Sequence, residues 1–187
     1  MKKDHEDASP RSEFRVAVVG HRKLRGIIIT QFVTAQCLTI LRQAQAEHGS
    51  VIAISALAEG ADSLFANAAL SLDIPLEIVR PFEEFSDDFP SGPSRKFYES
   101  LRRAARHETR LPFKGRSDEA YQVAMYWIID HSDLLVAVWD GRSAAGAGGT
   151  GDAVRYAQEK RRKFIHINVT ELTVTYYSSE QKEFAPP

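Results

Sequence analysis

The residues best suited to chemistry lie in a glycine-rich segment that follows an apolar run. Five of the eleven glycines fall between Gly141 and Gly151, and the segment closes with Gly148-Gly149-Thr150-Gly151-Asp152. Glycine allows the backbone to approach a ligand closely. Where a strand leads through such a loop into a helix, several N–H groups and the positive end of the helix dipole point at one anion. The segment therefore predicts a site for the phosphate of a nucleotide or sugar phosphate.

A second loop with candidate chemistry follows the first apolar run, residues 15–19. It contains Gly20, His21 and Arg22. Gly20 permits a tight turn, and the guanidinium of Arg22 can donate two parallel hydrogen bonds to a phosphate or carboxylate. His21 is a candidate acid or base, and a purely polar role for it remains open.

A third loop follows the apolar run 51–54 and leads into a predicted helix. Its candidate ligand-binding residues are Ser55, Ala56, Glu59, Gly60 and Asp62. We expect Glu59 and Asp62 in the first helical turn. There they either contact a ligand or only offset the helix dipole.

The end of the apolar run 134–139 adds Trp139, Asp140 and Gly141 to the candidates. Trp139 is interpreted as a core aromatic, with stacking on a nucleotide base as the alternative.

Several classes of site are disfavoured by the same motifs. No Lys-Ser or Lys-Thr pair follows the glycines, as a P-loop ATPase or kinase would require. The glycines also do not follow the first strand, where a dinucleotide fingerprint belongs. The histidines lack metal-ligand spacing and Cys37 is the single cysteine, so we expect no metal and no required cofactor other than a nucleotide-type ligand.

The apolar patterning predicts the elements that position these loops. Strands are expected at 15–19, 51–54, 74–79, 134–139 and 164–169, alternating with helices near 29–48, 59–72, 94–107, 121–129 and 152–160. This order predicts an α/β fold, Rossmann-like and doubly wound, with a mainly parallel sheet of five or more strands and helices on both faces. In such folds, ligands bind at the carboxyl ends of the strands.

The domain organisation is expected to be simple. We predict a polar N-terminal tail over 1–13, one nucleotide-binding domain over 14–169 and a C-terminal tail over 170–187. Within the domain, residues 80–116 are irregular and are predicted to form an insertion or a lid.

The composition limits the classes of binding partner and the cellular location that we expect. The formal net charge of −1 does not favour nucleic acid or anionic lipid. Threonine and glutamine interrupt the apolar stretch that begins at residue 27, so we expect no membrane span. The single cysteine is typical of a reducing cytoplasm, and this is the expected location.

The motifs at 18–22, 55–62, 133–141 and 148–151 together resemble the SLOG branch of the LOG/Smf superfamily. The resemblance implies a Rossmann-like fold that binds nucleotides or nucleotide-derived signals. Relatives include the Lonely Guy phosphoribohydrolases, molybdenum-cofactor carriers, a DNA-processing protein that binds single strands, and sensor domains of bacterial antiphage systems. Many are homodimers or higher oligomers, and a sensor would act through an effector protein.

The enzymes of this superfamily typically carry a Pro-Gly-Gly-x-Gly-Thr-x-x-Glu motif, from which this sequence departs. No proline precedes the glycines, and Val154 or a neighbour stands where the glutamate belongs. If the protein were an enzyme, Asp152 or Glu59 would supply the carboxylate and Arg22 or Arg116 the cation for cleaving an N-glycosidic bond. We therefore favour a sensor or carrier of a nucleotide, with a nucleotide N-glycosidase or phosphoribohydrolase as the alternative and single-strand DNA binding as the weaker one.

Overall fold

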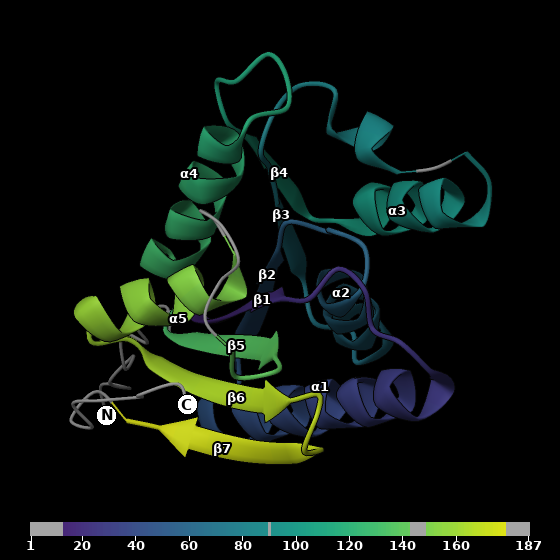
Figure 1. Cartoon of the computed structure of the whole chain (residues 1–187). Coiled ribbons are helices and arrows are strands. Elements are labelled where there is room, and N and C mark those ends of the chain that lie inside the picture. The colour runs from purple at the N-terminus through teal and green to yellow at the C-terminus, as the bar shows by residue number, and fades with distance from the viewer. Residues whose placement is uncertain (1–12, 90, 143–148, 179–187) are drawn as a thin grey trace, which may run out of the picture.

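One sheet forms the centre of the molecule (Figure 1). A computed structural model describes residues 13–89, 91–142 and 149–178. Within them the sheet has seven strands in the order β4-β3-β2-β1-β5-β6-β7. The strands are β1 (Phe14–Gly20), β2 (Val51–Ser55), β3 (Leu76–Arg80), β4 (His107–Arg110), β5 (Leu134–Trp139), β6 (Lys163–Asn168) and β7 (Thr173–Tyr177).

The pairing of the strands is parallel from β4 through to β6, and β7 runs antiparallel to β6. The prediction of an α/β fold with a mainly parallel sheet is confirmed. Parallel strands need crossover connections, and helices supply them here.

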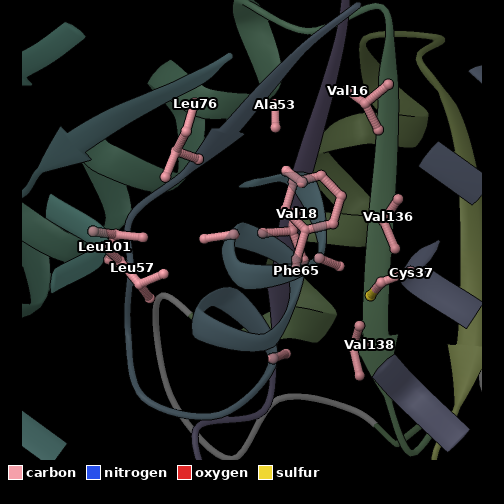
Figure 2. Close-up of a cluster of buried hydrophobic side chains, with 14 of the residues drawn as sticks. Val16, Val18, Cys37, Ala53, Leu57, Phe65, Leu76, Leu101, Val136 and Val138 are labelled. Atoms are coloured by element: carbon pink, nitrogen blue, oxygen red, sulfur yellow. The ribbon is translucent and has the colours of Figure 1, made fainter. Parts of the chain in front are cut away.

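Both faces of the sheet are covered, which explains why the central strands are continuously apolar. On one face the sheet packs against α1 (Ile27–His48), α2 (Ala61–Ser71) and α3 (Pro93–Ala104); on the other it packs against α4 (Asp118–Asp130) and α5 (Thr150–Glu159). Alternate residues of each strand serve the two cores. In β1, Val16 and Val18 belong to the first core and Ala17 and Val19 to the second. Figure 2 shows Val16 and Val18 in the first core with Val136 and Val138 of the neighbouring strand β5.

Helix α1, predicted near residues 29–48, presents an apolar stripe to the first core: Val33, Cys37, Ile40, Leu41 and Ala44 are buried. Burial raises the pKa of the Cys37 thiol to about 12, so it behaves as a small hydrophobic residue. By length and composition alone α1 is also long and apolar enough to cross a membrane, a test that core helices of water-soluble proteins also pass.

The segment after residue 170 was expected to be a tail, and this expectation is wrong for residues 173–177. These residues form β7, which pairs with β6 from Thr173 opposite Asn168 to Tyr177 opposite Phe164. Threonine, valine and tyrosine favour a strand even where one side faces solvent. The strand is short and lies at the sheet edge, so it lacks the long apolar run by which the central strands were found.

The irregular segment 80–116 contributes two elements besides α3. A 3-10 turn, η1 (Phe85–Asp88), follows β3, and β4 forms the other edge of the sheet. The sequence His-Glu-Thr-Arg of β4 has no apolar residue, which is why it was not predicted as a strand.

The order of the strands reverses between β1 and β5. From β1 the chain builds outward through β2, β3 and β4, and it then returns to place β5 on the other side of β1. The loops that leave β1 and β5 therefore diverge, and a crevice opens between them at the carboxyl ends of the strands.

Candidate functional site

A pocket of about 700 Å³ lies at this crevice. Its walls come from the ends of β1 and β5, the loops after β2 and β3, one side of α4 and the start of α5. The volume is within the range of small-molecule sites. The topology thus brings together loops that are distant in sequence.

Most of the predicted site residues line this pocket. Those that do so are Gly20, His21, Arg22, Ala56, Asp62, Arg116, Trp139, Asp140, Gly149, Thr150 and Gly151. Ser55, Glu59, Gly60, Gly141 and Asp152 are not part of the lining, and Gly148 lies outside the described residues.

The helix α5 points its N-terminus at the pocket. The N-cap residue is Gly149, which has no side chain that could cap the helix. Thr150 and Gly151, in the first turn, both line the pocket. A helix start without a side-chain cap offers its first N–H groups and the positive end of its dipole to an anion.

Two glycines allow the loop after β1 to lie directly on the start of α2. A Cβ atom at Gly20 would lie 2.5 Å from Cβ of Ala61, so no larger residue fits there. The N–H of Ala61 donates to the carbonyl oxygen of His21 (3.1 Å), and the N–H of His21 donates to that of Val138 (2.9 Å). Gly60 lies against the backbone of the loop after β1, so it shapes the site although it does not line the pocket.

Ser55 shapes the loop after β2. Its side chain is fully buried, accepts a hydrogen bond from the N–H of Leu57 (3.0 Å) and donates to the carbonyl oxygen of Asp62 (3.2 Å). These bonds hold Leu57 at a φ of 58°, an uncommon conformation for a residue other than glycine. The structure thus gives Ser55 a local role in the loop.

Asp62 is a buried carboxyl group that lines the pocket. Burial raises its pKa to about 7, although Arg22 and the N–H groups of Ala58 and Ala56 act in the opposite direction. A buried carboxyl group that titrates near neutral pH in a cleft is a common feature of functional sites.

The loops after β1 and β5 meet through His21 and Asp140. The imidazole Nε2 lies 3.4 Å from the Asp140 carboxylate and accepts the N–H of Asp140 at 3.3 Å. Burial works against the charge of Asp140, but the N–H of Arg142 (3.1 Å) and His21 lower the pKa of this carboxyl overall. Asp140 is therefore ionised at neutral pH.

The Arg22 guanidinium lies over the ring of Tyr121, 4.6 Å from its centroid, and donates to the carboxylate of Asp88 at 3.2 Å. The hydroxyl of Tyr121 donates to the same carboxylate, and Arg116 lies 3.8 Å from its second oxygen. Asp88 was missed by the sequence analysis. It lies 66 residues from Arg22, in a segment with no recognisable motif.

One wall of the pocket is apolar and comes from α4. Ala124, Met125 and Ile128 lie on one side of the helix below Tyr121. The sequence predicted this stretch only as a helix near residues 121–129, without a place in the site. The structure shows that this side of α4 also lines the pocket.

Trp139 fits its interpretation as a core residue. It is buried, and its indole N–H donates to the carbonyl oxygen of Arg142 at 2.8 Å. It forms the floor of the pocket at the end of β5.

The two carboxylates proposed for catalysis have other partners. Glu59 precedes α2 and accepts the hydroxyl of Ser94 at 2.8 Å. Asp152 forms an ion pair with Arg155, one turn later in α5. Gly141 turns the chain at a φ of 84°, beside Asn168 and His166.

Three arginines, Arg22, Arg116 and Arg142, line the pocket together with three aspartates, Asp62, Asp118 and Asp140. Among the described residues, no group of three or more metal-ligating side chains lies close enough to hold a metal ion. The pocket is therefore suited to an organic ligand with both an anionic group and hydrogen-bond donors.

No family model matches the sequence, and no curated protein matches it. Solved structures do match. The structure is similar to DNA processing protein A from Helicobacter pylori, with a TM-score of 0.57 and 15% identity over 84% of this chain and 70% of that one. DNA processing protein A from Streptococcus pneumoniae gives a TM-score of 0.58 and 15% identity over 82% of this chain, which spans half of that protein. A structural-genomics target, TM1055, gives 0.51 and 14% over 81% of this chain and 72% of that one. At this identity the likeness establishes the fold, so the chain has the Rossmann-like fold of these proteins.

Proposed function

We propose that the pocket binds a nucleotide, or a molecule derived from one, and that the protein acts as its sensor or carrier. The proposal is carried by one observation: α5 begins at a glycine N-cap, and its first turn lines a pocket that also holds three arginines and an apolar wall. A nucleotide combines the three matching parts, namely a phosphate, a sugar and a flat base.

Each part of the ligand has a matching part of the pocket. The first turn of α5 and the arginines suit the phosphate. The apolar side of α4, with Ala124, Met125 and Ile128, suits the base. Carboxylates accept hydrogen bonds from hydroxyl groups, so Asp62, Asp118 and Asp140 suit the ribose.

A thermal-shift panel tests the proposal. The pure protein is heated with each of the four ribonucleoside 5′-monophosphates and with the four nucleosides. A ligand at about 100 times its Kd stabilises the folded state by about 2.7 kcal/mol, which raises Tm by several degrees. We expect such a shift with at least one monophosphate and a smaller one with its nucleoside. Equal shifts for each pair would contradict a phosphate site.

Asp62 supports a second candidate function, the hydrolysis of an N-glycosidic bond. It is a pocket carboxyl group with a pKa of about 7, and such a group can act as a general acid or base at neutral pH. In this reaction the bond between the base nitrogen and C1′ breaks, the hydroxyl group of water bonds to C1′ and the remaining proton of that water goes to the base. Incubation with the monophosphates, followed by chromatography for free base, tests it. If the wild-type protein releases free base and the Asp62→Asn variant does not, the result favours this enzymatic function.

The similarity in fold suggests the binding of single-stranded DNA as a third candidate function. The Helicobacter pylori protein binds single-stranded DNA. This chain carries 24 basic and 25 acidic side chains, so strong binding of a polyanion would need a local basic path. Binding to an oligonucleotide at 50 and 200 mM salt tests this candidate, because contacts with several phosphates would make the affinity fall steeply.

A sensor must pass on the binding event, so we further propose that the protein forms a homodimer or larger homo-oligomer and acts on an effector protein. Light scattering after size-exclusion chromatography, with and without the monophosphate that binds best, gives the oligomeric state. A monomer in both conditions would contradict the oligomer.

A further inference from the structure

Asp88 lies outside the pocket lining, yet its carboxylate contacts three residues that line it. Its side chain is only 7% exposed. Arg22 reaches it from the loop after β1, Tyr121 from α4, and Arg116 from the loop before α4. One buried carboxylate therefore joins three separate parts of the pocket wall.

The position of Asp88 is set by the aromatic core beneath it. Phe85 begins the turn η1 that carries Asp88, and its ring packs edge-on against Phe82 (5.5 Å), Phe89 (5.5 Å) and Tyr98 (5.8 Å). Such packed aromatic rings fix the backbone of a short turn. Phe85 also lines the pocket, so this packing ties the turn that carries Asp88 to the pocket wall without using the Asp88 carboxylate.

Arg22, in contrast, belongs to a loop and has a long side chain that is 42% exposed. Its guanidinium is held on two sides, by the carboxylate of Asp88 at 3.2 Å and by the face of the Tyr121 ring at 4.6 Å. Burial disfavours the charge of Arg22, but Tyr121 and Asp88 raise its pKa overall. A guanidinium has five N–H donors, so the bond to Asp88 leaves most of them for other acceptors.

We propose that Asp88 is a positioning residue, which fixes the guanidinium of Arg22, and with it that of Arg116, at the mouth of the pocket to receive the anionic group of the ligand. The inference rests on the proposed nucleotide site. An arginine that is ordered before the ligand arrives loses less side-chain entropy on binding.

The chain offers a matched pair of variants on the same turn. Asp88→Asn removes the charge that holds Arg22 with little change in size. Asp87→Asn is the control, because Asp87 is exposed and pairs with Arg95 instead. Titration calorimetry uses the monophosphate with the largest thermal shift and its nucleoside. We expect Asp88→Asn to weaken the monophosphate about tenfold, the effect of losing one charge-assisted hydrogen bond, and the nucleoside less than twofold. Asp87→Asn leaves both unchanged.

A double-mutant cycle shows whether Asp88 acts through Arg22. If it does, Asp88→Asn adds little to the loss caused by Arg22→Ala, because the positioned group is already absent. Fully additive losses would overturn the proposal. So would tighter binding of the monophosphate to Asp88→Asn, since the carboxylate would then be a competitor of the ligand.

A readout without ligand separates this inference from the proposed function. The Nε–H of Arg22 can be followed by NMR, and its exchange with water slows when the guanidinium is held. We expect faster exchange in Asp88→Asn and wild-type exchange in Asp87→Asn. If no monophosphate binds but the Nε–H of Arg22 still exchanges faster in Asp88→Asn, the proposed nucleotide site is wrong, whereas the proposal that Asp88 positions Arg22 is supported. If monophosphates bind and Asp88→Asn changes neither exchange nor affinity, the positioning is wrong.

Discussion

Gly60 and His21 lie in direct backbone contact, although they belong to different loops. A Cβ atom at Gly60 would lie 2.4 Å from the carbonyl oxygen of His21, and Gly60 has a φ of 88°. Both the space and the conformation at this position therefore require glycine. The contact seats the start of α2 against the loop that carries His21 and Arg22 into the pocket.

Gly60→Ala should therefore destabilise the protein and disturb the pocket. The strained φ and the clash with backbone atoms together should cost about 2–4 kcal/mol of unfolding free energy. Urea denaturation measures this loss. Gly115→Ala is the control, because a Cβ atom there meets nothing within 4 Å, and its change should be under about 0.5 kcal/mol. Equal effects of the two substitutions would contradict the contact.

The stability should fall as the pH rises through the titration of Asp62. Its pKa is about 7 in the folded protein, against an ordinary value of 3.8. Between these values the folded state binds the proton and the unfolded state releases it, so raising the pH favours unfolding. The full loss, about 4 kcal/mol, is present above pH 7 and absent below about pH 4.

In the Asp62→Asn variant the side chain at this position is uncharged, so the variant should not lose unfolding free energy in this way as the pH rises. Urea denaturation of both proteins from pH 4 to pH 8 should show the variant gaining on the wild type by about 4 kcal/mol across the range. Parallel stability curves would mean that Asp62 is ionised without cost in the folded protein.

Gly151→Asp should separate stability from binding. A carboxylate in the first turn of α5 interacts favourably with the helix dipole, so the fold should keep its stability or gain about 0.5 kcal/mol. The same charge would repel a phosphate at that helix start and weaken a monophosphate at least tenfold, or about 1.4 kcal/mol. Gly151→Asn has nearly the same size without the charge, and should bind within about threefold of the wild type. Equal affinities of the Asp and Asn variants would place the phosphate elsewhere.

The edge strand β7 should contribute to stability through Tyr177. Its ring stacks on Phe164 of β6, with centroids 4.4 Å apart and planes 10° from parallel. Tyr177→Ala should cost about 1–2 kcal/mol of unfolding free energy, the range of a stacked cross-strand pair with its buried area. Tyr176 points to the other face and is 54% exposed, so Tyr176→Ala should cost less than about 0.5 kcal/mol. Thermal unfolding of the two variants compares them directly.

The parts of the fold that bury side chains on both faces could be predicted from the sequence. The apolar runs of β1, β2 and β5 gave strands close to their observed bounds, and the stripe from Val33 to Ala44 gave α1. The edge strands β4 and β7 could not be predicted in the same way. None of their residues is fully buried, so neither strand carries a long apolar run.

The loops of the candidate site could also be predicted, because each follows a recognisable strand. The partners within the site could not. Asp152 was expected near a ligand because it follows the glycines, but helix geometry brings it to Arg155. Asp88 has no signal in its own segment, and only the folded chain brings it to Arg22 and Tyr121.

Calorimetric titration of the wild-type protein with a ribonucleoside 5′-monophosphate and with the matching nucleoside tests the central claim most directly. If the start of α5 and the arginines hold a phosphate, one of the four monophosphates should bind at least tenfold more tightly than its nucleoside, a difference of about 1.4 kcal/mol or more. The difference should shrink in Gly151→Asp. If no monophosphate binds, or if each binds no better than its nucleoside, the pocket is not a nucleotide-phosphate site.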